Sequence, residues 1–205
     1  MSDSRIVPDG RTTNRDSRTT VAPPGVDVPE RHPDAPAPGE LVPSHYARCF
    51  ACGDDTAGLH MDVRAGEGLT VVAEFTVSER HQGAPGLAHG GLLAAAFDEA
   101  LGSLQWLLQV PSVTGRLETD YLRPVPVGSI VHIRAWVVGR EGRKIFSAAE
   151  GRLDGPEGQV VVTAAALFVV VPLRHFAEHG RETEVAAARD DDRVRRTVRS
   201  FEVNP

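Results

Sequence analysis

The sequence has few aromatic residues, only two cysteines, and no apolar run long enough to cross a membrane. Aromatic residues make up 5% of the 205 residues, which leaves few side chains on which nucleobases could stack. The longest apolar run, residues 160–172, is shorter than the ~20 residues of a membrane-spanning helix. Two cysteines cannot form the disulfide framework of a small secreted protein. These deficits argue against nucleic-acid-binding, membrane and disulfide-rich classes.

The charge balance and the first residues point the same way. The formal net charge is −6, which argues against a chain that coats nucleic acid. Residues 1–20 are polar and lack the apolar stretch of a signal peptide. We therefore expect a cytoplasmic protein that binds neither nucleic acid nor a membrane.

Composition along the chain predicts one domain between two tails. Residues 1–43 contain a proline-rich stretch that cannot bury enough apolar surface to offset chain entropy, so we expect it to be disordered. Residues 176–205 form a charged C-terminal tail in which three consecutive aspartates, 190–192, are followed by an arginine-rich stretch, 193–199. The predicted domain spans residues 44–175.

Hydrophobic periodicity inside that domain predicts an α+β fold. One apolar stripe at helical spacing runs from residue 89 to 109 and ends before Pro111. The other segments alternate as strands and are linked mostly by short turns, which favours antiparallel pairing; they are 59–63, 69–77, 113–123, 130–138, 144–153 and 160–171. The pattern predicts one long helix wrapped by an antiparallel sheet of about six strands. A single helix leaves much of such a sheet uncovered, so we also expect oligomerisation.

His89-Gly90-Gly91, at the start of the helical stripe, is the first candidate site. Two glycines allow close approach of a ligand to the first turn, where free N–H groups and the helix dipole can polarise a carbonyl oxygen. The alternative is an ordinary loop whose glycines only satisfy its dihedral angles.

Asp98 is the second candidate, because its helical neighbours are mostly small. Gly91, Ala94, Ala95 and Gly102 lie on its face of the helix, as expected where a substrate or another chain approaches closely. The alternative is an exposed, solvated aspartate. Glu99 points elsewhere on the helix, so we do not pair it with Asp98.

Polar residues on the later strands are weaker candidates. The Thr114 hydroxyl could hold a water or a thioester, although a β-branched residue in a strand needs no such role. The basic side chains of Arg123, before Pro124, and of Arg143 and Lys144 could meet phosphates. Basic residues at hairpins also serve solubility alone.

Cys49 and Cys52 form a CxxC pair followed by Gly53, a pattern similar to a zinc knuckle. His45 and His60 could complete a four-ligand set, but no second CxxC follows. We interpret the pair as two thiols and predict no metal.

Together these residues resemble the HGG…D signature of PaaI-type hotdog thioesterases. Asp98 follows His89 by nine residues, and Thr114 follows Asp98 by sixteen, with the Arg123-Pro124 pair later on the same strand. The CxxCG segment ahead makes the thioesterase-superfamily-member-4-like subgroup the most similar. The resemblance covers roughly residues 46–173 and neither tail.

The resemblance implies an acyl-CoA thioesterase of hotdog fold that needs no cofactor and works as a homodimer or homotetramer. The Gly90 N–H would polarise the thioester carbonyl, and Asp98 of the neighbouring subunit would act as general base or nucleophile. Thr114 would position the water or the carboxylate, while His89 would shape the loop. Gly91, Gln82, Arg123, Pro124, Arg143 and Lys144 would bind substrate.

One position departs from the family pattern, and other functions remain open. Many PaaI-type enzymes have Asn six residues before the His, where this chain has Gly83; Gln82 or His81 could substitute. The acyl group could lie beside Leu93 and Phe97, which are equally suited to the core. A non-catalytic acyl-CoA-binding module is the alternative function. A hydratase would need an Asp/His arrangement that the sequence does not contain.

Overall fold

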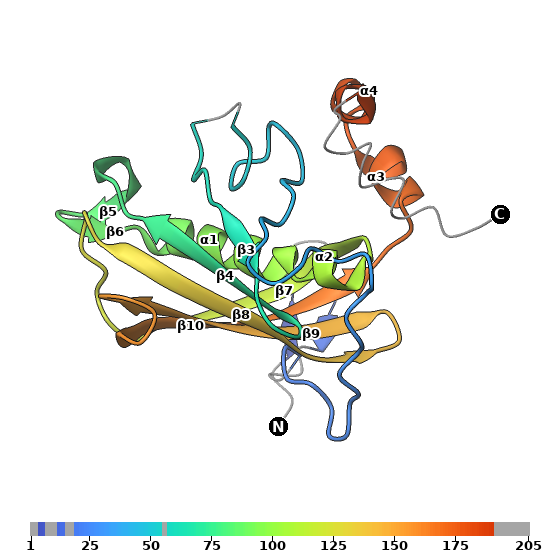
Figure 1. The fold of residues 1–205 in the computed structure, drawn as a ribbon, viewed down its shortest axis with the longest axis horizontal. Helices are drawn as coiled ribbons and strands as arrows, with labels where there is room; N and C mark the ends of the chain where they lie inside the picture. Colours follow the sequence, from blue (N-terminus) through green and yellow to red (C-terminus); the bar gives the residue numbers. More distant parts are fainter. Residues whose placement is uncertain (1–3, 7–11, 15–18, 55–56, 191–205) are drawn as a thin grey trace.

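A six-stranded antiparallel sheet packs against one long helix (Figure 1). The computed structural model describes residues 4–6, 12–14, 19–54 and 57–190. The strand order is β3-β4-β8-β9-β10-β7, which confirms the predicted class. In chain order the strands are β3 (Val63–Ala65), β4 (Thr70–Thr76), β7 (Ser112–Tyr121), β8 (Ile130–Glu141), β9 (Lys144–Leu153) and β10 (Gln159–Val170).

Two short two-stranded sheets accompany the main one. The strands β1 (Ser4–Ile6) and β2 (Thr12–Asn14) pair near the N-terminus. The second pair, β5 (Gln82–Ala84) and β6 (Leu87–Ala88), follows the 3-10 helix η1 (Glu79–His81) and directly precedes the long helix. Sequence periodicity did not predict these strands, because strands of two or three residues are too short to show alternation.

The predicted helix is present but is divided into two segments. The segment α1 (Gly90–Ser103) continues with a break at Leu104 into α2 (Gln105–Leu108). Gln109 ends α2 in the left-handed conformation, at φ 52°, and its side chain donates to the Trp106 carbonyl at 2.8 Å. The helix therefore ends ahead of Pro111, close to the predicted position.

The core lies between α1 and the concave face of the sheet. Phe97, Leu101 and Leu104 of the helix are fully buried, as is Phe75 of β4. A side chain in place of Gly151 of β9 would collide with the Phe97 ring, at 2.6 Å from Cζ. The fit between helix and sheet is therefore tight, and it fixes the directions of the remaining helix faces.

Residues 19–43 lie against the domain, although the sequence predicted disorder up to residue 43. The His32 N–H donates to the Leu107 carbonyl at 2.9 Å, and Val42 is buried and donates to the Val63 carbonyl at 2.8 Å. Prolines leave such a segment without periodicity, yet isolated apolar and backbone contacts still hold it. Much of the predicted disordered tail, residues 1–3, 7–11 and 15–18, lies outside the described residues.

The C-terminal segment contains two short helices beside the body of the sheet and α1 (Figure 1). They are α3 (Arg174–His179) and α4 (Glu182–Asp190). Glu184 of α4 accepts from the Tyr46 hydroxyl at 2.7 Å and pairs with Arg48 at 3.1 Å. The charged residues from 191 onward lie outside the described part of the chain.

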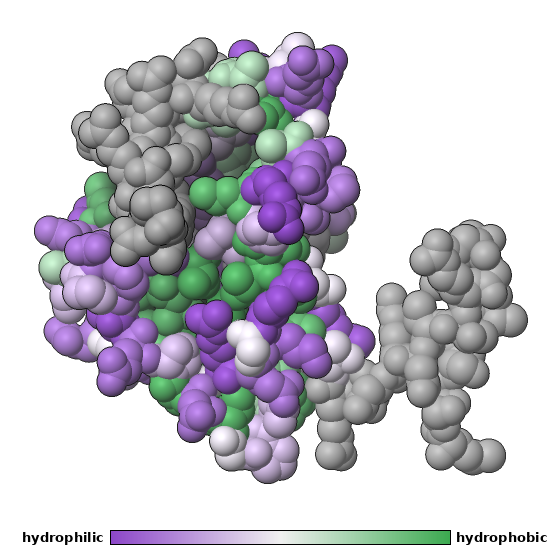
Figure 2. Space-filling view, turned by 90° about the vertical axis from the view of Figure 1, so that its right-hand side faces the viewer, coloured by the Kyte–Doolittle hydropathy of each residue, from purple (hydrophilic) through white to green (hydrophobic). Residues whose placement is uncertain are grey.

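The described surface mixes apolar and hydrophilic residues. On the side shown in Figure 2, apolar side chains gather in patches between hydrophilic ones. Tyr121 and Leu122, at the end of β7, are 49% and 56% exposed. Among the described residues, no helix has the length and apolar character needed to span a membrane.

Candidate active site

The first turn of α1 has one backbone donor left over. His89 is the N-cap: its Nδ1 accepts from the Gly91 N–H at 2.9 Å. Its carbonyl accepts from Leu92 and Leu93 at 3.0 and 3.2 Å. The half-buried Gly90 N–H has no acceptor among the described residues. This amide can donate to a ligand at the positive end of the helix dipole.

The loop before His89 is held by its own hydrogen bonds. The His89 N–H donates to the His81 carbonyl at 2.7 Å. Gln82 donates from Nε2 to the Glu79 carbonyl at 3.0 Å and accepts from the Gly86 N–H at 2.8 Å. Both the nitrogen and the oxygen of the Gln82 amide thus form hydrogen bonds within the loop, so this side chain stabilises the loop beside the site.

Gly83, six residues before His89, packs closely against the N-cap residue. A Cβ there would lie 2.8 Å from His89 Cα and 3.0 Å from His89 Cβ. Any side chain would therefore push against the N-cap residue, which explains why this loop requires glycine.

Tyr121 is a site residue that sequence reasoning missed. Its hydroxyl donates to the Gly90 carbonyl at 2.7 Å. The tyrosine lies at the end of β7, two residues ahead of Arg123, and only the folded chain brings it to the helix start. It fixes the peptide that follows the free amide.

Asp98 and Thr114 form the second half of the candidate site. The Thr114 hydroxyl donates to Asp98 Oδ1 at 3.0 Å. Burial raises the pKa of Asp98, and the bond from Thr114 partly opposes this rise. Ala94, Ala95 and Gly102 beside it are only partly covered, so the face remains open to another molecule.

The two halves do not meet within one chain. Asp98 lies eight residues along α1 from Gly90, a separation of about 12 Å. On β7, Thr114 and Tyr121 are seven residues, or about 24 Å, apart. A donor and a base must each lie within about 3 Å of the reacting groups, so one chain cannot supply both to one carbonyl.

The predicted basic residues divide between the same two ends. Arg123 and Pro124 are exposed and precede Val125, whose carbonyl accepts from Ala88 beside His89 at 2.9 Å. Arg143 donates to the Val170 carbonyl at 2.8 Å, and Lys144 lies 3.9 Å from Glu141, in the hairpin near the start of β7. They are spread over two regions and do not form one patch in a single chain.

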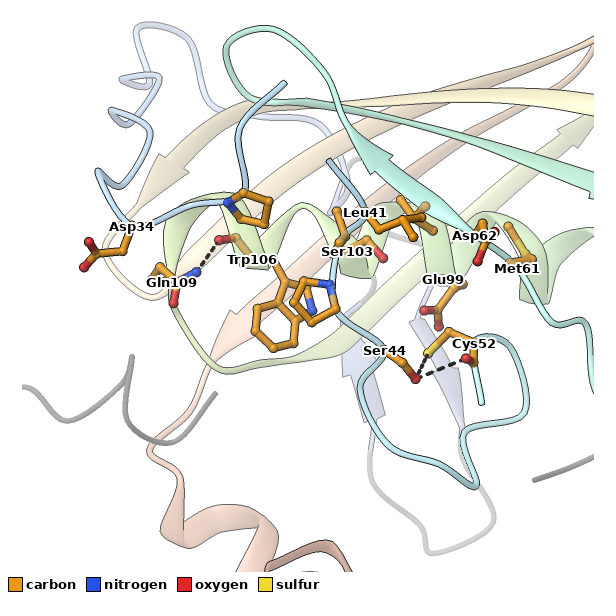
Figure 3. Close-up of a pocket in the computed structure, with 14 residues that line it drawn as sticks. Asp34, Leu41, Ser44, Cys52, Met61, Asp62, Glu99, Ser103, Trp106 and Gln109 are labelled. Atoms are coloured by element: carbon orange, nitrogen blue, oxygen red, sulfur yellow. Dashed lines mark hydrogen bonds between the residues drawn. The ribbon is translucent and has the colours of Figure 1, made fainter. Parts of the chain in front are cut away.

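Leu93 and Phe97 are part of the core. They are 3% and 0% exposed, which leaves no channel beside them for an acyl chain. The structure instead has a pocket of about 450 Å³ on another face of the helix. Glu99, Ser103 and Trp106 form its helical wall, and Leu41 and Met61 line it from the N-terminal segments (Figure 3). Asp98 lies about 100° away around the helix.

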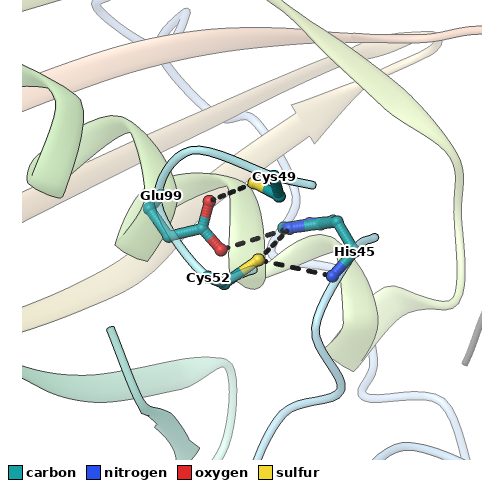
Figure 4. A group of neighbouring side chains, drawn as sticks. All are labelled: His45, Cys49, Cys52 and Glu99. Carbon is teal, nitrogen blue, oxygen red and sulfur yellow. Dashed lines mark hydrogen bonds and ion pairs between the residues drawn. The ribbon is translucent and has the colours of Figure 1, made fainter. Parts of the chain in front are cut away.

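The same pocket reaches a cluster of potential metal ligands. His45, Cys49, Cys52 and Glu99 each offer one ligand atom, and these atoms lie within 4.8 Å of one another (Figure 4). The sequence suggested His45 and His60 together beside the cysteines. The structure brings in His45 and the buried Glu99, while His60 lies outside the group.

Comparisons with known proteins agree with this architecture. Residues 85–162 match the model of the thioesterase superfamily. Acyl-coenzyme A thioesterase THEM4 of Xenopus laevis is 34% identical over 88 residues, which cover 43% of this chain and 39% of that protein. The Bos taurus protein of the same name is 41% identical over 88 residues, with 43% and 35% covered. The match therefore spans about two fifths of these relatives.

Solved structures share the fold at low sequence identity. The Escherichia coli PaaI protein aligns with a TM-score of 0.52 at 18% identity, covering 56% of this chain and 81% of that chain. Zebrafish thioesterase superfamily member 2 also gives 0.52, at 20% identity, with 61% and 93% covered. A Streptococcus mutans protein bound to acetyl-CoA gives 0.52 at 19% identity, with 58% and 94% covered.

The chain has a hotdog fold, one helix packed against an antiparallel sheet, which it shares with the solved proteins above, and its residues 85–162 are similar to the thioesterase superfamily.

Proposed function

We propose that this protein is an acyl-CoA thioesterase, which hydrolyses the thioester to a free carboxylic acid and CoA. One observation carries the proposal: a free helix-start amide and a carboxylate held by Thr114 lie at opposite ends of the same edge strand. The printed names of the THEM4 relatives support the substrate class. Thioester hydrolysis needs a carbonyl polariser and a group that activates water, and it needs no cofactor.

A second copy of the chain would bring the two ends together. In the described part of the chain, β7 pairs with β10 alone and its other edge has no partner strand. Two such edges paired antiparallel about a two-fold axis place the end of one strand against the start of the other. Gly90 and Tyr121 of one copy would then face Asp98 and Thr114 of its partner. We therefore propose a homodimer as the smallest active unit, which could pair further into a tetramer.

Each residue then has a distinct chemical role. The Gly90 N–H donates to the thioester carbonyl oxygen and stabilises the charge that develops there. Asp98 takes a proton from water as the water oxygen adds to the carbonyl carbon, or attacks that carbon itself. The C–S bond then breaks, its electron pair leaves with sulfur, and the thiolate of CoA takes up a proton. Where Asp98 itself has attacked, water then hydrolyses the acyl–aspartate anhydride, which releases the carboxylic acid and restores the Asp98 carboxylate. Thr114 orients the carboxylate, and His89 holds the loop.

The exposed basic residues supply candidates for binding the phosphates of CoA. Arg123 lies beside the Gly90 end of the site, and Arg143 and Lys144 lie near the Thr114 end. In the dimer arranged as above, these ends come from different copies and adjoin. Guanidinium and ammonium groups are the usual partners of phosphate oxygens.

The test is a free-thiol release assay over a panel of acyl-CoAs. Asp98→Asn keeps the shape of the side chain but removes the base, and we expect turnover to fall by about 10²–10⁴-fold. Asp154→Asn is the matched control, because Asp154 lies exposed in the β9–β10 turn at φ 63°, a conformation that Asn also adopts. Undiminished turnover in a folded Asp98→Asn variant would rule out the role of Asp98. Acyl-CoA binding by the wild type without turnover would instead indicate a binding module.

A further inference from the structure

The segment between residues 44 and 53 is folded around its cysteines. The Gly53 N–H donates to the Cys49 carbonyl at 2.9 Å, closing a tight turn over the CxxCG sequence. A Cβ on Gly53 would lie 2.3 Å from the Ala47 carbonyl oxygen and 2.6 Å from that of Cys49. Only glycine fits there, so the backbone brings both thiols to the same side of the turn.

This turn faces a buried carboxylate on α1. Glu99 is only 8% exposed, although a buried carboxylate is costly unless it is paired. Its Oε1 lies 3.1 Å from His45 Nδ1, and its Oε2 lies 3.9 Å from Cys49 Sγ. The helix thus presents an anionic oxygen to the thiols and the imidazole (Figure 4).

The spacing of the four ligand atoms fits a tetrahedral metal ion. Zinc binds sulfur at about 2.3 Å and nitrogen or oxygen at about 2.0–2.2 Å, which sets tetrahedral ligand atoms about 3.4–3.8 Å apart. His45 Nδ1 lies 3.4 Å from Cys52 Sγ, and the whole group falls within 4.8 Å. Small side-chain movements are enough to close the group around an ion.

Two groups of the surrounding chain lie beside the sulfur of Cys52. The His45 backbone N–H and the Ser44 hydroxyl each lie 3.4 Å from it. Such outer contacts orient the ligands of metal sites.

We propose that His45, Cys49, Cys52 and Glu99 bind one structural zinc ion, which ties the loop of residues 44–53 to α1. Four protein ligands close the coordination shell, as in structural sites, and leave no position for a catalytic water. The ion would offset the buried negative charge of Glu99. It lies on a different helix face from Asp98, so its role is to hold the loop that borders the pocket.

Zinc content and cobalt substitution of the reduced, full-length protein test the proposal. We expect about one zinc per chain after reconstitution with zinc alone. Cobalt(II) in the same site should give the thiolate-to-metal absorption bands of a tetrahedral cysteine site. Glu99→Gln and the double variant Cys49→Ser/Cys52→Ser should reduce zinc retention at least about tenfold. His60→Asn is the control, because His60 lies outside the cluster and its φ of 50° is one that Asn also adopts, so this variant should bind zinc like the wild type.

Neither readout depends on thioesterase turnover, so the two proposals fail separately. The cobalt spectrum is recorded on the wild type, and it therefore stays informative if a variant fails to fold. Absence of thiolate bands in the reduced wild type would overturn the zinc site. Equal zinc retention in the wild type and in a folded Glu99→Gln variant would overturn the assignment of Glu99.

Discussion

At the scale of single residues, the start of α1 uses its neighbouring amides within the chain and leaves one open. Gly91, Leu92 and Leu93 all donate to His89, through its ring nitrogen or its carbonyl. The Gly90 N–H is the donor that remains. Its role can be tested with proline at position 90, because proline lacks the N–H and the local backbone already has a conformation that proline adopts.

We expect Gly90→Pro to lower kcat by about 10²–10³-fold, the usual effect of losing one oxyanion donor. Proline lacks the N–H but is favoured at the first helical position, and His89 has the extended conformation, φ −72° and ψ 125°, that proline tolerates before it. The control is Gly90→Ala, which keeps the N–H and brings a Cβ within 3.3 Å of the exposed Tyr121 ring. Equal kcat values for the two variants, with circular dichroism unchanged, would contradict donation by this amide.

Thr114→Val should have a smaller effect than Asp98→Asn. Valine preserves the branched shape and removes the hydroxyl that donates to Asp98 Oδ1 at 3.0 Å. A hydrogen bond to a charged group contributes about 1.5–3 kcal/mol, so we expect kcat to fall roughly 10- to 150-fold. Steady-state kinetics on the best acyl-CoA of the panel measure this. A loss as large as that of Asp98→Asn would mean that Thr114 contacts the reacting atoms itself.

At the scale of elements, α1 serves three purposes on three faces. Phe97 and Leu101 pack on the sheet, Asp98 lies on the small-residue face, and Glu99 points to the cysteine turn. Successive residues of a helix are 100° apart, so neighbours in sequence reach different surroundings. The turn around Cys49 depends on α1 for its position.

Removal of the proposed zinc should lower the melting temperature of the reduced protein. We expect a loss of at least about 1 kcal/mol, equivalent to a fall in Tm of about 2–4 °C for a chain of this size. Calorimetry with and without a chelator measures the change. Glu99→Gln, compared in the same way, should show little further fall. Equal falls in both proteins would show that the chelator acts elsewhere.

At the scale of the whole molecule, one copy contains both halves of the candidate site but keeps them apart. In the described part of the chain, the edge of β7 away from β10 has no partner strand, and Tyr121 and Leu122 are exposed, so a second copy could cover this surface. In the proposed two-fold dimer, Gly90 of one copy lies against Asp98 of its partner, so the two residues must lie apart along α1 within each copy.

Mixing two inactive variants tests the shared site. In a two-fold dimer of Gly90→Pro with Asp98→Asn, one site combines both lesions and the other is intact. Random assortment makes half of the dimers mixed, so we expect roughly a quarter of the wild-type activity after co-refolding. The separately refolded variants are the control. A mixture no more active than its components would contradict a site built from two chains.

Sequence periodicity determined the long helix and the five longer strands of the main sheet, because each of these elements must bury one face whatever its neighbours are. Residues 144–153 were predicted as a strand and form β9 with the same bounds. The spacing of His89, Asp98 and Thr114 also identified the candidate site, since a motif on a helix and the next strand keeps its order. The fold places the Thr114 hydroxyl 3.0 Å from Asp98 Oδ1, and the catalytic roles of these residues stay predictions.

Tertiary packing determined the contacts between distant segments, which hydrophobic periodicity does not predict. Residues 19–43 have no regular apolar pattern, yet backbone bonds hold them to the domain. Tyr121 reaches Gly90, and Glu99 joins Cys49, because the fold brings together residues separated by 31 and 50 positions. Local sequence determines which face a side chain occupies, whereas the partner it meets there depends on contacts between distant segments.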